Sequence, residues 1–197
     1  MKSRKSVELN ERLSKRWLGY AAAAGAAGVS MFAVPSPAAA DIIYTPADIV
    51  IPHDGIPVPI DFGHGAAANF SLWIRSYVDF GPFSSDLFLY GRNAANLVIG
   101  QGQGFAARLA AGATIGAGQK FAPTHRTFGI PLIALKRFYS NGTHTTCTGP
   151  WAQPARSGYL GLEFDISGQE HFGWARLNAG CLVGGRRVGA ILTGYAF

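Results

Sequence analysis

Residues 158–180 have the sequence GYLGLEFDISGQEHFGWARLNAG, in which two largely apolar runs flank the segment Ser167-Gly168-Gln169. Alternation of apolar and polar residues is typical of a strand that has one buried face. A short break that contains glycine between two such runs predicts a β-hairpin. This stretch therefore indicates an antiparallel β protein.

The length of the turn decides which faces of the two strands combine. Residues directly opposite each other in an antiparallel pair project to the same side of the sheet. A three-residue turn places Phe164 opposite Phe172 and Leu162 opposite Trp174, so that all four side chains enter the core. We expect this arrangement, because two large aromatic side chains left in water would forgo several kcal/mol of burial energy.

The alternative is a turn of two or four residues. It would put Glu163 on the same face as Trp174 and Arg176, which would produce an exposed aromatic and charged patch. In the expected register, Glu163 and Asp165 instead lie on the wetter face, opposite the core.

Short apolar runs bounded by Gly, Pro, Asn or Asp recur along the rest of the chain. This spacing predicts the strands of a sandwich or barrel, including a strand at residues 107–116, whereas the polar residues 140–158 predict a long loop. Residues 41–197 suit one domain, since a chain of this size buries roughly 70% of its unfolded surface. We expect an all-β fold, a single antiparallel β-sandwich that is jelly-roll-like in broad class.

Residues 1–40 are typical of a cleavable signal segment. Six Lys and Arg residues come first, and an apolar run of mainly Ala and Gly follows them. Ala38-Ala39-Ala40 supplies the small residues that a signal peptidase requires, so we expect cleavage between Ala40 and Asp41. The weak hydrophobicity of the run favours removal over permanent anchoring. We expect the mature chain to be secreted, periplasmic or on the cell surface, without stable membrane insertion.

The charge balance changes when the signal segment is removed. Six of the 17 basic residues and two of the 11 acidic residues lie in residues 1–40, which leaves 11 basic against nine acidic residues. The high isoelectric point is therefore mostly a property of the targeting segment. The sequence gives no reason to expect a nucleic-acid partner.

Both cysteines of the chain, Cys147 and Cys181, lie in the expected mature part. Disulfides persist in the compartments that exported proteins reach, and free thiols are liabilities there. We therefore expect these two residues to form a disulfide, with their Cα atoms within about 7 Å of each other.

Three carboxylates near the predicted hairpin are the candidate catalytic groups. Glu163 and Asp165 project to one face, and Glu170 lies near the turn. A glycosidase uses a pair of carboxyl groups about 5 to 9 Å apart. The same spacing occurs on any solvated strand face, and we prefer that interpretation, so no catalytic residue is assigned.

Trp151, Trp174 and Arg176 are the candidate ligand-binding residues, although burial of Trp151 as a plug over the core is favoured. We expect no metal site, because the histidines show no ligand spacing; they are His53, His64, His125, His144 and His171. The run IGQGQGF at residues 99–105 has the glycines of a dinucleotide fingerprint but lacks its βαβ context. We interpret these as turn glycines and expect no cofactor.

Three segments together resemble a family of exported bacterial proteins of unassigned activity. They are AAADIIYTP at residues 38–46, YLGLEFDISGQEHFGWARLN at residues 159–178 and ILTGYAF at residues 191–197. The family carries a late signature YLG-x-F, H-(F/Y)-GW-x-R-L and GYA, and some members end in a PEP-CTERM sorting tail, which this sequence lacks. The resemblance implies export and a β-rich fold, and it implies no mechanism.

Similar proteins contain a calcium-loop-like segment, and the matching residues here are IDFGHGAAANF. A hard cation requires six or more oxygen ligands, several of them charged. Asp61 and Asn69 cannot supply that number, so we expect no calcium at this loop.

These observations favour a non-enzymatic module on the cell surface or outside the cell, with a glycan or another surface component as its partner and a possible role in the matrix. The alternative is a carbohydrate-active hydrolase that uses Glu163, Asp165 or Glu170.

Overall fold

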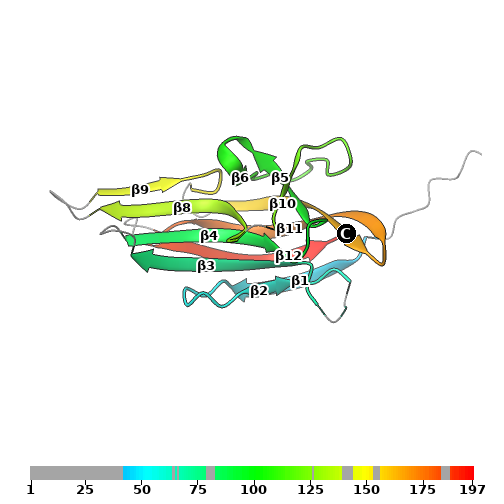
Figure 1. The fold of residues 1–197 in the computed structure, drawn as a ribbon, viewed down its shortest axis with the longest axis horizontal. Coiled ribbons are helices and arrows are strands. Elements are labelled where there is room, and N and C mark those ends of the chain that lie inside the picture. Colours follow the sequence, from blue (N-terminus) through cyan, green and yellow to red (C-terminus); the bar gives the residue numbers. More distant parts are fainter. Residues whose placement is uncertain are drawn as a thin grey trace, which may run out of the picture. The chain divides into compact units, whose positions relative to one another are not determined.

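The computed structural model describes residues 42–63, 65, 67–78, 83–125, 127–138, 144–152, 156–182 and 187–197. The expected signal segment, residues 1–40, and the expected cleavage site between Ala40 and Asp41 lie outside these residues. Two antiparallel sheets pack face to face, and β3, β4 and β8 lie over β10, β11 and β12 (Figure 1). The prediction of an all-β antiparallel sandwich is confirmed. The described residues contain no helix that is long and apolar enough to span a membrane.

Within the described residues, one sheet has seven strands and the other has five. In spatial order, the seven-strand sheet contains β1 (Tyr44–Val50), β12 (Val188–Ala196), β11 (Gln169–Cys181), β10 (Arg156–Ile166), β5 (Leu97–Gln101) and β6 (Phe105–Ala106), and β7 (Phe121–Pro123) also pairs with β5. The five-strand sheet contains β2 (Val58–Ile60), β3 (Phe70–Val78), β4 (Phe83–Gly91), β8 (Ile130–Phe138) and β9 (His144–Thr148). A short 3₁₀ turn, Gly102–Gly104, joins β5 to β6.

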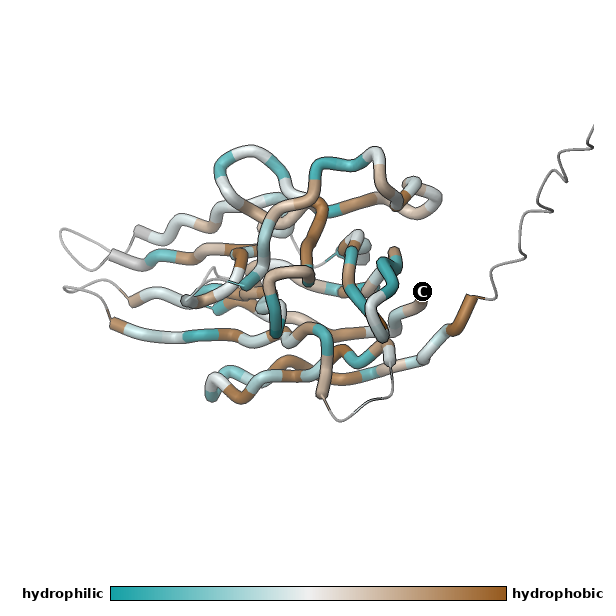
Figure 2. Tube along the Cα trace, turned by 45° about the vertical axis from the view of Figure 1, so that its right-hand side comes forward, coloured by the Kyte–Doolittle hydropathy of each residue, from teal (hydrophilic) through white to brown (hydrophobic). Residues whose placement is uncertain are grey.

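The core lies between the two sheets. Hydrophobic and hydrophilic residues alternate along many of the strands, as Figure 2 shows, so that each sheet turns its apolar side inward. Leu160, Leu162 and Phe164 of β10 are buried, and the rings of Phe62 and Phe164 stack at 4.2 Å between centroids. These contacts form one continuous hydrophobic cluster that draws on both sheets.

The predicted register of the β10–β11 hairpin is wrong. Ile166 pairs with Gln169, so the turn has only two residues, Ser167 and Gly168, with φ values of 56° and 82°. Positive φ at both central positions is what a type I′ turn requires, and its twist matches that of the flanking strands. Glu163 therefore stands opposite Phe172, and the alternative register is the one that forms.

Packing of the β11 inner face explains this register. Gly173, Ala175 and Ala179 point into the core, and they leave space for large side chains from the other strands. A Cβ atom on Gly173 would lie 2.5 Å from the carbonyl oxygen of Ala196 and 3.1 Å from Cε1 of Phe164. A Trp174 side chain on this face would displace the stack of Phe62 and Phe164. The core is filled by β10, β12, Leu177 of β11 and the five-strand sheet, while Phe172 and Trp174 face outward.

Two other expectations are corrected. Residues 140–158 were expected to form a loop, but β9 lies within them as an edge strand, and Thr148 Oγ1 donates a hydrogen bond to the carbonyl of Ala134 at 3.1 Å. Residues 107–116 were expected to form a strand, but they contain turns and only one β-bridge, between Leu109 and Tyr159. Gly112, with φ of 81°, directs this segment away from extended geometry.

Cys147 and Cys181 form the predicted disulfide, and their Cα atoms are 6.6 Å apart. The bond joins β9, at the edge of the five-strand sheet, to the end of β11 in the seven-strand sheet. It therefore links the two layers covalently, at a place where both cysteines pack against the core cluster.

Removing this disulfide should destabilise the domain. Replacement of both Cys147 and Cys181, which have a sequence separation of 34, by serine is expected to lower the free energy of unfolding by roughly 4 kcal/mol in the chain-entropy treatment. Urea denaturation of the mature protein and of the double variant measures the difference. An unchanged midpoint, or two free thiols titrated in the native protein, would contradict the assignment.

Candidate functional site

The two-residue turn gives the outer face of β10 and β11 an unusual composition. Tyr159, Glu163 and Asp165 of β10 lie on the face away from the core, and Phe172, Trp174 and Arg176 of β11 lie on the same face. The structure thus brings together five of the six residues that the sequence analysis named as candidates. They are Glu163, Asp165, Glu170, Trp174 and Arg176.

Three aromatic rings form a strip across this face, and we call Tyr44, Trp174 and Tyr159 the aromatic strip. The Tyr44 and Trp174 rings stack with centroids 5.8 Å apart, and the Trp174 and Tyr159 rings meet edge to face at 5.4 Å. Tyr44 can lie this close because Gly194 has no side chain, since a Cβ atom there would be 2.6 Å from the Tyr44 hydroxyl. The rings shield one another, so Trp174 is half-buried although it faces outward.

A hollow of about 270 Å³ opens beside two of these rings, and we call it the aromatic hollow. Its other walls come from residues 109–113 and Ile115, all of which are small or apolar. Two backbone hydrogen bonds between Leu109 and Tyr159, of 2.9 and 3.0 Å, hold this segment beside β10. A Cβ atom on Gly161 would come within 2.5 Å of Ile99 and 3.0 Å of Leu109, so the glycine allows both side chains to lie over the strand.

Arg176 borders the aromatic strip. Its guanidinium carbon lies 6.0 Å from the ring centroid of Tyr159, and its side chain is exposed. An arginine next to aromatic faces adds hydrogen-bond donors to a surface that is otherwise apolar. Arg176 is therefore placed to contact a polar group on a molecule that covers Trp174 or Tyr159.

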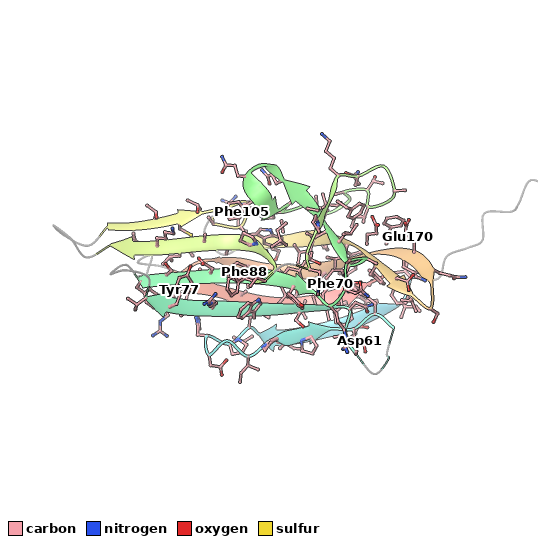
Figure 3. The ribbon with its side chains drawn as sticks, viewed as in Figure 1. Asp61, Phe70, Tyr77, Phe88, Phe105 and Glu170 are labelled. Carbon is pink, nitrogen blue, oxygen red and sulfur yellow. A yellow bond between two sulfur atoms is a disulfide. The ribbon has the colours of Figure 1, made fainter. Side chains whose placement is uncertain are left out.

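The three carboxylates gather toward the turn end of the hairpin. Asp165 and Glu170 are directly paired across the two strands, and Glu163 lies on the same face two residues before Asp165. Figure 3 shows Glu170 at this end, away from Phe105 of β6. Asp165 Oδ1 accepts a hydrogen bond from the backbone N–H of Gly168 at 2.9 Å, so one of these groups supports the turn itself.

Burial raises the pKa of Glu163, and the nearby charge of Glu170 raises it further. The surroundings of Glu163 explain the burial, because it pairs with Phe172 on one side and with Leu97 of β5 on the other. The Phe172 ring in turn lies 5.8 Å from the ring of Phe121. The carboxylates thus adjoin a separate apolar region, and none of the described residues that line the aromatic hollow is acidic.

Trp151 is fully buried, which confirms the plug interpretation and excludes this side chain as an exposed ligand contact. Its Nε1 atom has no hydrogen-bond partner among the described residues. The loop with Asp61 and Asn69 uses its oxygens locally, because these side chains accept hydrogen bonds from the backbone N–H groups of Gly63 and Phe62. Within the described ranges, no group of three or more His, Cys, Asp or Glu residues is arranged to hold a metal ion.

Asp86 is the most deeply buried carboxylate in the described part of the chain, and it lies away from this site, on β4. It accepts hydrogen bonds from the Tyr77 hydroxyl at 3.1 Å and from the backbone N–H of Leu135 at 3.2 Å. Burial raises its pKa. Because its partners come from β3 and β8, Asp86 ties three strands of the five-strand sheet together, and its role is structural.

Sequence reasoning missed Tyr44, Tyr159 and the wall at residues 109–115. The sequence pattern could have identified Tyr159 as an outward-facing residue, because it alternates with Leu160 on β10 and is two residues from Gly161. Tyr44 joins the strip only because β1 pairs with β12, with Tyr44 opposite Ala196. No local pattern in the sequence predicts that long-range pairing.

Comparison of the chain with models of protein families, with curated proteins and with solved structures finds no match.

The raised pKa of Glu163 predicts how stability changes with pH. A folded-state pKa above the ordinary value of 4.5 means that the folded protein binds this proton more tightly than the unfolded chain. The resulting stability is present below the ordinary pKa and is lost as pH rises through the raised pKa. Glu163→Gln should therefore gain stability relative to the wild type as pH rises through this window.

Denaturant melts of both proteins between about pH 3 and pH 8 measure this difference and cancel the contribution of Asp86, which both share. Glu170→Gln is the matched control. It removes one cause of the raised pKa of Glu163, so the loss of stability with rising pH should become smaller in that variant. A wild-type minus Glu163→Gln difference that stays constant with pH would show that Glu163 titrates as an ordinary solvated carboxylate.

Proposed function

We propose that the mature chain is a non-enzymatic module, secreted or displayed in the periplasm or on the cell surface, that binds a glycan through the aromatic strip and the aromatic hollow. The observation that carries this proposal is the position of Trp174, which stacks on Tyr44 and meets Tyr159 at the rim of the hollow. A matrix role follows if the bound glycan is part of the extracellular material.

The chemistry of the site fits a sugar. Binding pockets for small molecules are mainly apolar and aromatic, with a few polar groups that fix orientation. A sugar ring presents C–H groups on its faces and hydroxyl groups at its edge, so one face can lie on Trp174 or Tyr159 while Arg176 reaches a hydroxyl. The walls at residues 109–113 carry no charge that would repel such a ligand.

The disulfide supports the proposed location. Cystine bonds persist in oxidising compartments and are rare in the cytosol. Together with the charged and apolar opening of the sequence, the bond between Cys147 and Cys181 favours export. We also propose membership of the exported bacterial family that the sequence resembles, on the strength of residues 159–178.

A hydrolase is the second candidate, because the structure places Glu163, Asp165 and Glu170 on one face and raises the pKa of Glu163. Directly paired residues such as Asp165 and Glu170 have Cβ atoms about 4.5–5.5 Å apart, which is compatible with a glycosidase pair. A general acid also requires a raised pKa. Against this candidate, no described residue that lines the aromatic hollow carries a carboxylate, so the proposed sugar site and the described acidic groups are separate.

A glycan array followed by calorimetry on the best ligand tests the proposal. Trp174→Ala should weaken binding by at least about tenfold, as expected for a central aromatic contact. The same change at Trp73 is the matched control, because Trp73 lies on the outer face of the other sheet, against Phe88 at 5.7 Å. Trp73→Ala should leave the affinity within about twofold of the wild type.

A panel of glycoside substrates separates the two candidates. Turnover that Glu163→Gln or Glu170→Gln abolishes would establish the hydrolase and contradict the module. Equal loss of binding in Trp174→Ala and Trp73→Ala, with both variants folded, would show that the aromatic strip is not the binding surface.

A further inference from the structure

A second hollow, of about 400 Å³, adjoins the aromatic hollow, and the two share the wall at residues 109–111. We call it the polar hollow, because Gln101, Arg108 and Ser157 line it together with Pro150. A third hollow, of about 380 Å³, adjoins it in turn at Gln101 and Pro150 and extends to Gln103 and Phe105. The hollowed surface thus continues beyond the aromatic strip, and its lining changes from apolar to polar.

The two glutamines that line these hollows, Gln101 and Gln103, come from the β5–β6 hairpin. The glycines of this hairpin were interpreted from the sequence as turn residues. Gln101 pairs with Phe105, and the three residues between them form the turn. Gln103 has φ of 70°, a conformation that costs a non-glycine residue free energy and tends to persist at functional sites. Neither glutamine side chain is buried, and each can both donate and accept hydrogen bonds.

Arg108 supplies the positive charge. Its side chain lies along β10 at Gly158, where a Cβ atom would be 2.6 Å from Arg108 Cγ and 3.0 Å from Nε. The glycine therefore lets the arginine stem lie directly over the strand, which limits its freedom and keeps it in the wall of the polar hollow beside Ser157. A guanidinium held in one place loses less conformational entropy when it binds an anion than a freely mobile one does.

In the part of the chain that the structure describes, no acidic residue lines any of the three hollows. We propose that the ligand is an acidic polysaccharide: one sugar lies in the aromatic hollow, and a carboxylate or sulfate group of a neighbouring sugar binds Arg108, with Gln101 and Gln103 bonding its hydroxyls. This inference rests on the proposed glycan-binding function and names the ligand class. Arginine pairs with such anions through charge-assisted hydrogen bonds, which are about twice as strong as neutral ones.

Calorimetry of the mature protein with three polymers tests the inference. Polygalacturonate supplies carboxylates, dextran sulfate supplies sulfates, and dextran is the neutral control. Arg108→Gln replaces the charged guanidinium with a neutral amide on a shorter stem and should weaken binding to the acidic polymer by about tenfold. Gln103→Gly suits the positive φ without strain and should weaken it by about threefold.

Arg92→Gln is the matched control, because Arg92 is exposed and lines none of the three hollows. It removes the same charge and should leave the affinity within about twofold of the wild type, whereas added salt should weaken wild-type binding. Binding of either acidic polymer that Arg108→Gln weakens and Arg92→Gln does not weaken supports the inference, and the polymer that binds identifies the anion.

Three results would overturn the inference. If Arg92→Gln and Arg108→Gln weaken binding equally, the attraction is a general effect of positive charge. If the protein binds neutral glycans through Trp174 and acidic ones no more tightly, the inference fails while the proposed function stands. If no glycan binds, both fail together.

Discussion

The two-residue turn between β10 and β11 is the constraint on which the account of the site depends. Ser167 and Gly168 both adopt positive φ, and this turn fixes which residues of the two longest strands stand opposite each other. Because side chains alternate along a strand, one more residue in the turn would exchange the inner and outer faces of β11 relative to β10. The free-energy cost of positive φ at Ser167 is offset by the core packing that the register allows.

That packing depends on small residues as much as on large ones. Gly173 makes room for Phe164, whose ring stacks on Phe62 from the other side of the core. On the outer face, Gly161 and Gly194 make room for Leu109 and Tyr44 in the same way. Glycines thus allow both the core stack and the assembly of the aromatic strip. The strip regains much of the burial energy that an outward-facing Trp174 would otherwise lose.

The sequence was sufficient for the architecture and insufficient for the register. Alternation and turn residues predicted a sandwich, and export chemistry predicted the bond between Cys147 and Cys181. Trp174 does not enter the core, although burial of a large aromatic side chain is favourable, because distant segments of the chain cover part of its ring on the outer face. That cover comes from β1 and from residues 109–115, whose positions depend on long-range pairing. Glu163 and Asp165 lie on the outer face, as expected, but Phe172 and Trp174 lie on that face too.

Interstrand distances in solution test the register most directly. In an antiparallel pair, the closer pairs of opposite residues have Cα atoms about 4.5 Å apart, which brings their Hα atoms within range of the nuclear Overhauser effect. For the labelled mature protein, the account predicts Hα–Hα cross peaks between Glu163 and Phe172 and between Gly161 and Trp174, the pairs that the two-residue turn aligns. Cross peaks between Phe164 and Phe172 or between Leu162 and Trp174 in their place would contradict it, because Trp174 would then belong to the core.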